Sequence, residues 1–249
     1  MMLAARLGLN VPKVWHLYLP EPAFIIERFG RAPGPEEPLR LHVLDGTQML
    51  NEPSYNKYSS ETFPKLKDLI EQCRNKAVAR MEVFRWIVFN TMVGNSDSHL
   101  KNISFIVDHE GRRVAPFYDL LCTAVYHTRV FLDEGAVWPN EKLASPVAGA
   151  NFFSDVTFDK LIDTGLELGL SKSAAVREVV KIVGRLADAA DEIIAQLESI
   201  LADPGAPQGA PSQMTKAAER RMLRSIRAIV IADMLRYVRL PVAAAKEPQ

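Results

Sequence analysis

The stretch Gly94-Asn95-Ser96-Asp97-Ser98-His99-Leu100-Lys101-Asn102, with Asp119 seventeen residues after its last position, is the part of this chain that decides its fold. Asp97 and Asn102 have the spacing of the aspartate and asparagine in the protein-kinase catalytic loop, H-R-D-x-x-x-x-N. In phosphoryl transfer the aspartate orients the attacking hydroxyl, and the asparagine and a second aspartate hold Mg²⁺ on the ATP phosphates. The pattern therefore predicts a phosphotransferase site in which Asp97 faces the hydroxyl, while Asn102 and Asp119 bind Mg²⁺.

The composition is that of a globular protein without net charge. The chain has 249 residues, 48% of them hydrophobic, which suits one large or two small domains and excludes a disordered chain. Lys plus Arg and Asp plus Glu both number 30, so the whole protein is no general polyanion binder, although local patches remain open. The two cysteines, Cys73 and Cys122, form no C-x-x-C and read as free thiols in a reducing compartment. With no apolar run near the roughly 18 residues that cross a bilayer, we expect a cytoplasmic protein without membrane contact.

The first part of the chain alternates between helical and strand patterns. Apolar spacing and Gly, Pro and Asn positions predict a helix end over 1–9, a hairpin of strands 14–19 and 23–28, a loop over 31–38, a capped helix over 61–73 and a buried helix over 77–93. The buried helix leads directly into the stretch that carries Asp97. Two short strands, 102–107 and 113–118, follow around the turn 108–111 and would return Asp119 beside Asn102.

The second part of the chain reads as helical. We expect helices over 157–168, from 171 or 173 to 201, and over 215–240, with a linker at 203–213 and a frayed tail from 241. The predicted fold class is therefore α+β and rich in helices, with one hairpin carrying the chemistry.

Two further residues of the loop are candidates for catalysis. His99 lies two positions after Asp97 and either fills a structural role, steadies the loop by hydrogen bonding, or approaches a phosphate oxygen. Lys101 either touches the γ-phosphate as a point charge or is a solvated lysine. The D-x-x-x-x-N spacing alone is a weak signal, and a solvated turn would also produce it. The signal is stronger in this chain because the loop follows a predicted buried helix and precedes a predicted hairpin.

These motifs occur together in one known family. The loop 94–102, with Ala-Pro-Phe-Tyr-Asp-Leu-Leu at 115–121, resembles the HipA family of bacterial serine/threonine kinases, which are toxins of toxin–antitoxin modules. Further likenesses are the helix at 2–9, a hinge at 24–31, the R-L-H and K-Y elements at 39–45 and 55–58, and a small-residue segment at 143–149. The resemblance covers residues 1 to about 200, and several motifs occur in order.

The resemblance implies a two-lobed, protein-kinase-like fold of which this chain represents mostly the helical large lobe. It implies that Asp97 is the catalytic base, that His99 supports it, and that Asn102 and Asp119 bind Mg²⁺. The backbone of Glu27, Arg28 and Phe29 would hold the adenine of ATP. Implied partners are a protein substrate, an aminoacyl-tRNA synthetase in characterised relatives, and a HipB-like DNA-binding antitoxin, so that nucleic acid would be met indirectly.

Several parts of the family pattern are not found. No G-x-G-x-x-G or G-x-x-x-x-G-K precedes Asp97, and neither the phosphate-binding lysine nor the autophosphorylated serine of the small lobe is present. Lys13 is the only lysine before the hinge, and its place in a loop does not suit that role. Gly30 and Ala148 replace the family's usual Asp and Gly. Three explanations stay open: a true start further upstream, one half of a split kinase completed by a separate small-lobe protein, or a catalytically silent kinase fold that binds an antitoxin-like partner.

We divide the chain into a small-lobe remnant with hinge (1–31), a large lobe (32–202) containing the loop 94–102 and the metal-binding hairpin 102–119, a linker (203–213) and a basic amphipathic helix (214–240). That helix carries seven Lys or Arg residues against Glu219 and Asp233. It either docks on the large lobe with its basic side in water, or contacts tRNA, DNA or an acidic partner. A small-molecule kinase of the aminoglycoside or lipid type shares the D-x-x-x-x-N loop, but the E-R-F, R-L-H and K-Y elements favour the HipA family.

Overall fold

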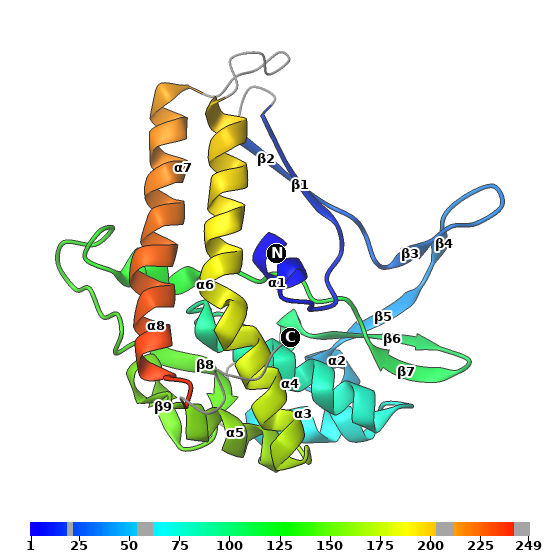
Figure 1. Ribbon diagram of the computed structural model, residues 1–249. Coiled ribbons are helices and arrows are strands. Elements are labelled where there is room, and N and C mark those ends of the chain that lie inside the picture. Colours follow the sequence, from blue (N-terminus) through cyan, green and yellow to red (C-terminus); the bar gives the residue numbers. More distant parts are fainter. Residues whose placement is uncertain (19–21, 54–61, 203–211, 242–249) are drawn as a thin grey trace.

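The computed structural model describes residues 1–18, 22–53, 62–202 and 212–241 (Figure 1). The helices are α1 (Met2–Arg6), α2 (Gly46–Met49), α3 (Thr62–Glu71), α4 (Lys76–Met92), α5 (Phe158–Glu167), α6 (Lys172–Ala202), α7 (Gln213–Ser225) and α8 (Ala232–Tyr237), with the π-helix η5 (Ile226–Ile231) between α7 and α8 and short 3₁₀ turns η2 (Leu100–Asn102), η3 (Thr123–His127) and η4 (Phe153–Asp155). The strands are β1 (Val14–Tyr18), β2 (Pro22–Ile26), β3 (Arg31–Ala32), β4 (Leu39–Arg40), β5 (His42–Asp45), β6 (Ser104–Asp108), β7 (Gly111–Val114), β8 (Lys142–Val147) and β9 (Ala150–Phe152).

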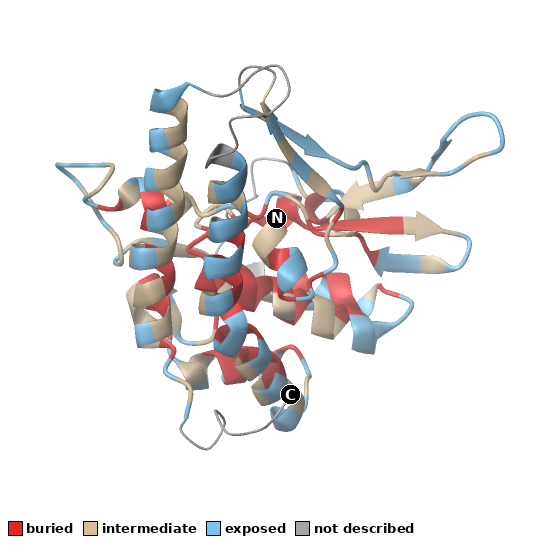
Figure 2. Cartoon of the chain, turned by 45° about the horizontal axis from the view of Figure 1, so that its top comes forward, coloured by how far each residue is buried: buried red, intermediate tan, exposed pale blue. Residues whose placement is uncertain are grey.

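Helix α4 is the centre of the molecule. It begins where the Asn75 side chain accepts a hydrogen bond from the Val78 N–H at 3.1 Å, which caps the first turn. Its side chains are buried on several sides, including Trp86, Phe84 and Phe89. Helices α3, α5 and α6 and strands β7 and β8 pack around it. The buried residues gather in the middle of the molecule (Figure 2). The predicted buried helix is confirmed, and the mostly apolar character of its second half, which is buried from Trp86 to Met92, follows from this central position.

The hairpin that carries the candidate chemistry belongs to a larger sheet than the sequence indicated. Strands β5, β6 and β7 form an antiparallel sheet in that order, with Asp45 opposite Ser104 and Phe105 opposite Val114. The first predicted strand of the hairpin is confirmed. The end predicted for the second strand, residue 118, is wrong, because β7 stops at Val114. Pro116 has no N–H to continue a ladder, and the Phe117 N–H donates instead to the Asn10 carbonyl oxygen at 2.8 Å.

Most other predicted elements are confirmed. They include α1, the β1–β2 hairpin, α3, α5 with its Thr157 cap, and α6. The last helix differs from the prediction: it begins at Gln213 behind a Ser212 cap, ends at Tyr237, and contains the π-helix. The pairs β3–β4 and β8–β9 were not predicted. The K-Y element at 55–58, the predicted cap of α3, most of the linker and the tail beyond residue 241 lie outside the described residues.

Helices α6 and α7 stand side by side, and the β1–β2 hairpin lies next to the upper part of α6 (Figure 1). The Tyr18 hydroxyl of β1 donates to Glu219 of α7. Within the described ranges, none of the helices combines the length and the apolar character that crossing a bilayer requires.

The packing of α4 predicts that truncating the Phe84 side chain strongly lowers the stability of the fold. Its ring is 0% exposed and lies against α5, so close that a Cβ at Gly165 would be 3.1 Å from it. We expect Phe84→Ala to lower the free energy of unfolding by about 3–5 kcal/mol, measured by urea unfolding. Leu166→Ala, at a neighbouring site that is 42% exposed, should change it by less than about 0.5 kcal/mol. Equal effects of the two substitutions would contradict the central role of α4.

Candidate active site

The loop 94–102 leaves α4 through a glycine that no other residue could replace without strain. Gly94 has φ +67°, and a Cβ there would lie 2.6 Å from Cγ1 of Val230 and 2.9 Å from the Cβ of Ala124. Its carbonyl oxygen accepts the Ala124 N–H at 2.9 Å. The start of the loop is therefore held between the segment after Asp119 and the π-helix η5.

Asp97 presents its carboxylate at the surface while its backbone is fixed. The side chain is 43% exposed, which leaves it accessible to a substrate hydroxyl. Its carbonyl oxygen accepts hydrogen bonds from the His99 N–H at 2.9 Å and from Nδ2 of Asn102 at 2.8 Å. Because Nδ2 of Asn102 is used in this way, the Oδ1 of the same amide points to the other side and can serve as a neutral oxygen ligand.

The backbones of His99 and Lys101 both take part in the hydrogen bonding of the loop. The His99 side chain is 8% exposed, and its Nε2 lies 3.7 Å from Oδ1 of Asp97. Its carbonyl oxygen accepts the Asn102 N–H at 2.8 Å. Of the roles considered for His99, steadying the loop beside Asp97 is the one that this geometry favours. The Lys101 carbonyl oxygen accepts the Tyr118 hydroxyl at 2.7 Å, so its backbone is tied to the residue before Asp119.

Asp119 adopts a left-handed backbone conformation, with φ +54°. Aspartate tolerates this region better than most residues, and non-glycine residues held there are frequent at functional sites. The Tyr118 hydroxyl is within 2.7 Å of Oγ of Ser104, which ties the segment to β6. Burial raises the pKa of the Tyr118 phenol, against a lowering by the Ser104 bond, so the phenol stays a protonated donor. The Asp119 side chain is exposed at the end of this well-anchored segment.

Asn95 joins the two carboxylate-bearing segments, and the sequence analysis did not identify it. Its side chain is buried, at 2% exposure, and its Oδ1 accepts the Asp97 N–H at 3.1 Å. Its Nδ2 donates to Oδ1 of Asn90 on α4 at 2.8 Å and to the Asp119 carbonyl oxygen at 3.3 Å. One buried amide thus connects α4, Asp97 and Asp119. Asparagine is common in turns, so its presence there is a weak signal. The only other signal in the sequence was its position inside the motif 94–102.

The predicted hinge lies next to this site. The ring of Phe29 stacks on the ring of Tyr118, with centroids 5.7 Å apart. The Glu27 N–H donates to the Lys13 carbonyl oxygen at 2.9 Å and is thereby occupied. None of the hydrogen bonds between described residues uses the Phe29 N–H. The hinge can therefore offer this N–H and the Glu27 carbonyl oxygen to an adenine, while the Glu27 and Arg28 side chains are exposed.

The residues present suit a Mg²⁺ ion that arrives with phosphates. Asn102 and Asp119 offer one amide oxygen and one carboxylate, the hard oxygen ligands that Mg²⁺ prefers. In the described part of the chain, no three His, Cys, Asp or Glu side chains gather as a metal cage. Mg²⁺ is usually held by one or two carboxylates together with substrate phosphates, so two protein ligands fit this use.

The C-terminal helix formed by α7, η5 and α8 packs against the start of the loop 94–102. Val230 of η5 is 0% exposed and packs with Ala124 and Val125 of η3. Asp233 accepts the Trp138 indole N–H at 3.0 Å. Several basic residues of the helix are engaged within the chain: Arg224 with Glu198, Arg227 with Asp191, Arg236 with Asp233, and Arg221 with the Val130 carbonyl oxygen. The helix packs against α6, η3 and η4, in line with the docking that the first of its two interpretations predicted.

Comparison with known proteins places this geometry in a family. A model of the HipA-like C-terminal domain matches residues 1–194. The serine/threonine-protein kinase toxin HipA of Shewanella oneidensis is 33% identical over 143 residues, covering 51% of this chain and 33% of that protein. A HipA structure from the same organism, in complex with HipB and operator DNA, matches with a TM-score of 0.74 and 25% identity, covering 100% of this chain and 57% of that one. The Helicobacter pylori proinflammatory kinase CtkA matches with a TM-score of 0.50 at 15% identity, covering 93% and 82% of the two chains, which shows the fold alone.

The protein has an α+β, protein-kinase-like fold, as the sequence predicted. The chain belongs to the HipA-like C-terminal domain family. It spans about a third of the length of the curated HipA relative, 33% by residue coverage. The helix formed by α7, η5 and α8 lies beyond the matched residues.

The hydrogen bonds of Asn95 predict that this amide supports the site. Asn95→Ala leaves buried partners on Asn90 and Asp119 unsatisfied, so we expect unfolding to become easier by about 1–3 kcal/mol. Amide hydrogen exchange at Asp97 should accelerate, because its acceptor is lost. Asn151→Ala, at an exposed position of β9, is the matched control and should change neither quantity. Unchanged exchange at Asp97 would remove Asn95 from this role.

The contact of η5 with Gly94 predicts a local effect of Val230→Ala. We expect faster amide exchange at Ala124 and Ser96, whose N–H groups bond across the start of the loop to Gly94 and Thr123. Val238→Ala removes the same atoms at another position of 0% exposure, in the main core. Both substitutions should cost roughly 2 kcal/mol of stability. Only Val230→Ala should affect the loop, and equal exchange in both variants would contradict the contact's role.

Proposed function

We propose that this chain is the large-lobe part of a Mg²⁺- and ATP-dependent serine/threonine protein kinase. The observation that carries the proposal is the joint anchoring of Asp97, Asn102 and Asp119. Asn95 bonds to the backbones of both aspartates, and Asn102 bonds to the Asp97 carbonyl oxygen. A solvated turn would have no reason to bury an amide that links both carboxylate-bearing residues to a core helix.

In this function each residue has a defined task. The Asp97 carboxylate accepts a hydrogen bond from the substrate hydroxyl and takes its proton as the γ-phosphoryl group moves from ATP to that oxygen, leaving ADP. His99, beside Asp97, holds the loop, and Lys101 carries a positive charge near it. When bound through Asn102 and Asp119, Mg²⁺ would neutralise phosphate charge. The hinge groups at Glu27 and Phe29 would hold the adenine ring.

We extend the proposal to the biological setting, with the relatives as its support. The proposed substrate is a protein hydroxyl, with an aminoacyl-tRNA synthetase as the first class to test. The Shewanella HipA structure contains HipB and DNA, which supports an antitoxin of that kind as a partner here. In this proposal nucleic acid is met through the antitoxin, and the protein works in the cytoplasm. The division into a small-lobe remnant, large lobe, linker and basic helix is part of the same proposal.

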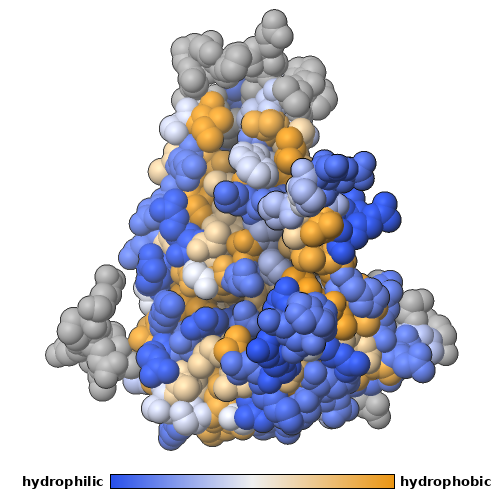
Figure 3. All heavy atoms as spheres, turned by 90° about the vertical axis from the view of Figure 1, so that its right-hand side faces the viewer, coloured by the Kyte–Doolittle hydropathy of each residue, from blue (hydrophilic) through white to orange (hydrophobic). Residues whose placement is uncertain are grey.

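A separate small-lobe protein is a further proposed partner, supported by the β1–β2 hairpin. Trp15 pairs with Ile25, so both lie on one face of the hairpin with Leu17. These side chains are 46%, 42% and 41% exposed. Hydrophobic side chains also gather at the upper part of the surface in Figure 3. A two-stranded sheet alone is marginal, and an added polypeptide would cover this face. The same face also favours the alternative function, a catalytically silent kinase fold that binds a partner.

Calorimetry with Mg·ATP tests the nucleotide site. We expect binding to the parent chain, at least tenfold weaker binding to Asp119→Ala, and unchanged binding to the control Asp133→Ala at an exposed loop position. Absence of binding to the parent would favour the silent fold or a dependence on the small lobe.

Transfer of ³²P from ATP to protein should vanish in Asp97→Asn while the ATP affinity of this variant stays within about twofold of the parent's. Transfer that survives in Asp97→Asn would contradict the assignment of the base.

A further inference from the structure

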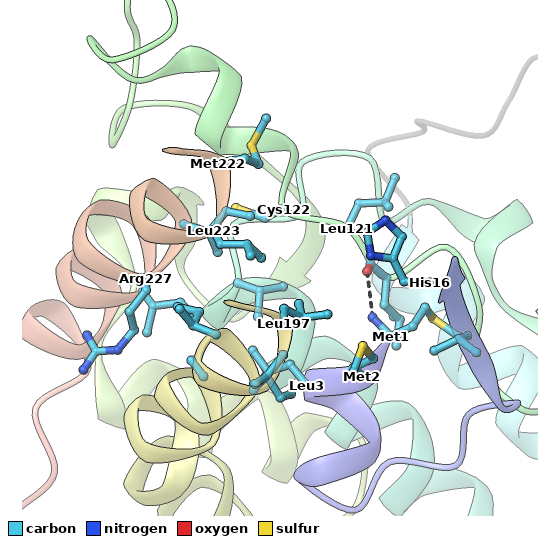
Figure 4. Close-up of a pocket in the computed structure, with 18 of the residues that line it drawn as sticks. Met1, Met2, Leu3, His16, Leu121, Cys122, Leu197, Met222, Leu223 and Arg227 are labelled. Carbon is cyan, nitrogen blue, oxygen red and sulfur yellow. Dashed lines mark hydrogen bonds between the residues drawn. The ribbon is translucent and has the colours of Figure 1, made fainter. Parts of the chain in front are cut away.

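A cavity of about 450 Å³ lies between the β1–β2 hairpin, α1, α6 and the C-terminal helix (Figure 4). Its wall is overwhelmingly apolar, with Met2 and Leu3 of α1, Leu197 of α6 and Met222 and Leu223 of α7 among the contributing residues. The volume lies within the range of small-molecule sites, roughly 300–1,000 Å³. The cavity is separate from the loop 94–102, none of whose residues lines it.

One side of the cavity carries a small polar cluster. The Tyr18 hydroxyl donates to the Glu219 carboxylate, and Nε2 of His16 lies 3.4 Å from the other carboxylate oxygen. Burial, followed by the hydrogen bond and charge of Glu219, raises the pKa of Tyr18, so the phenol remains a donor. Each carboxylate oxygen has a further lone pair, which makes Glu219 an acceptor at the edge of an apolar chamber.

The other polar groups of the wall add no free anion-binding charge at neutral pH. The Met1 amino group donates to the Leu120 carbonyl oxygen at 3.4 Å, and burial lowers its pKa to about 6. The Arg227 guanidinium is paired with Asp191, with Nη2 2.9 Å from Oδ2. Burial raises the pKa of the Cys122 thiol to about 12, so this side chain is a neutral, weakly polar part of the wall. An anionic ligand would therefore meet the Glu219 carboxylate without a free cation to offset it.

We propose that this cavity is a binding site for a neutral apolar organic molecule, aromatic or aliphatic, that carries one hydrogen-bond donor directed at Glu219. The apolar wall supplies the affinity, and the carboxylate fixes the orientation. The methionine side chains from α1 and α7 can adapt to different ligand shapes. A polypeptide side chain inserted from a partner is the other occupant to consider, and it differs in the experiment below.

The position of the cavity brings such a ligand next to the two segments that lead into the candidate active site. Leu120, Leu121 and Cys122 line it directly after Asp119, and Phe89 and Val93 line it just before Gly94. A ligand would touch both segments that lead into the site. If the proposed kinase function holds, ligand binding and Mg·ATP binding are coupled reciprocally, because a coupling free energy acts equally on both.

The test uses N-phenyl-1-naphthylamine, a neutral aromatic probe with one N–H donor, and the full chain without nucleotide. We expect saturable fluorescence enhancement with the parent chain. Leu197→Trp, which fills the cavity, should weaken binding at least tenfold. Leu166→Trp, at a site 42% exposed on α5, is the matched control and should leave the affinity unchanged. Glu219→Gln, which removes the charge of the acceptor, should weaken binding severalfold.

The outcomes separate the alternatives. Equal affinity of Leu197→Trp and Leu166→Trp, or no saturable binding to the parent chain, would overturn the proposal. If Leu197→Trp fails to unfold cooperatively in urea, Leu223→Trp from the facing helix takes its place. Saturable binding with no response to Glu219→Gln would favour an inserted apolar side chain over a donor-bearing molecule. This experiment contains no nucleotide. A negative result for probe binding therefore does not contradict the proposed kinase function, which Mg·ATP calorimetry tests separately.

Discussion

The rest of the candidate site depends on one buried amide, that of Asn95. Asn95 bonds at once to α4 through Asn90 and to the backbones of Asp97 and Asp119. Inside a protein an unpaired amide group is costly, so a network whose members are all satisfied holds a single geometry. Asp97 and Asp119 can then present their carboxylates to solvent without losing position. The hydrogen bonds of Asn95 thus fix the backbones of Asp97 and Asp119 relative to α4, while both carboxylates stay exposed.

The C-terminal helix extends the same support to the other side of the molecule. At one end Glu219 of α7 holds the β1–β2 hairpin through Tyr18 and His16. Further along, Val230 of η5 packs against the glycine that opens the loop 94–102. The π-helix places the consecutive residues Val230 and Ile231 both at 0% exposure, and such segments are frequent near functional sites. This helix lies beyond the residues 1–194 that match the family model, while the Shewanella HipA structure covers the whole chain.

The distribution of exposed and enclosed apolar surface indicates where further molecules would act. The hairpin face that carries Trp15, Leu17 and Ile25 is largely exposed, which suits contact with a polypeptide. The cavity beside it is lined by residues of the hairpin, α1, α6 and the C-terminal helix, among others, and its volume suits a small molecule. Both lie close to the hinge that Phe29 joins to Tyr118. The nucleotide, the small molecule and the added lobe would therefore all act on one hinge region.

The sequence by itself determined the fold class, most helices and the residues that would carry the chemistry. Local signals were sufficient there, because a cap such as Thr157 and the apolar character of α4 act within a few residues. The end of β7, the pairing of β5 with β6, and the π-helix were decided only by the tertiary structure. Each depends on a contact distant in sequence, such as that of Phe117 with Asn10 or of Val230 with Gly94. The same holds for Asn95, since an asparagine in a turn becomes a link between two aspartates only after the chain has brought Asp119 back to it.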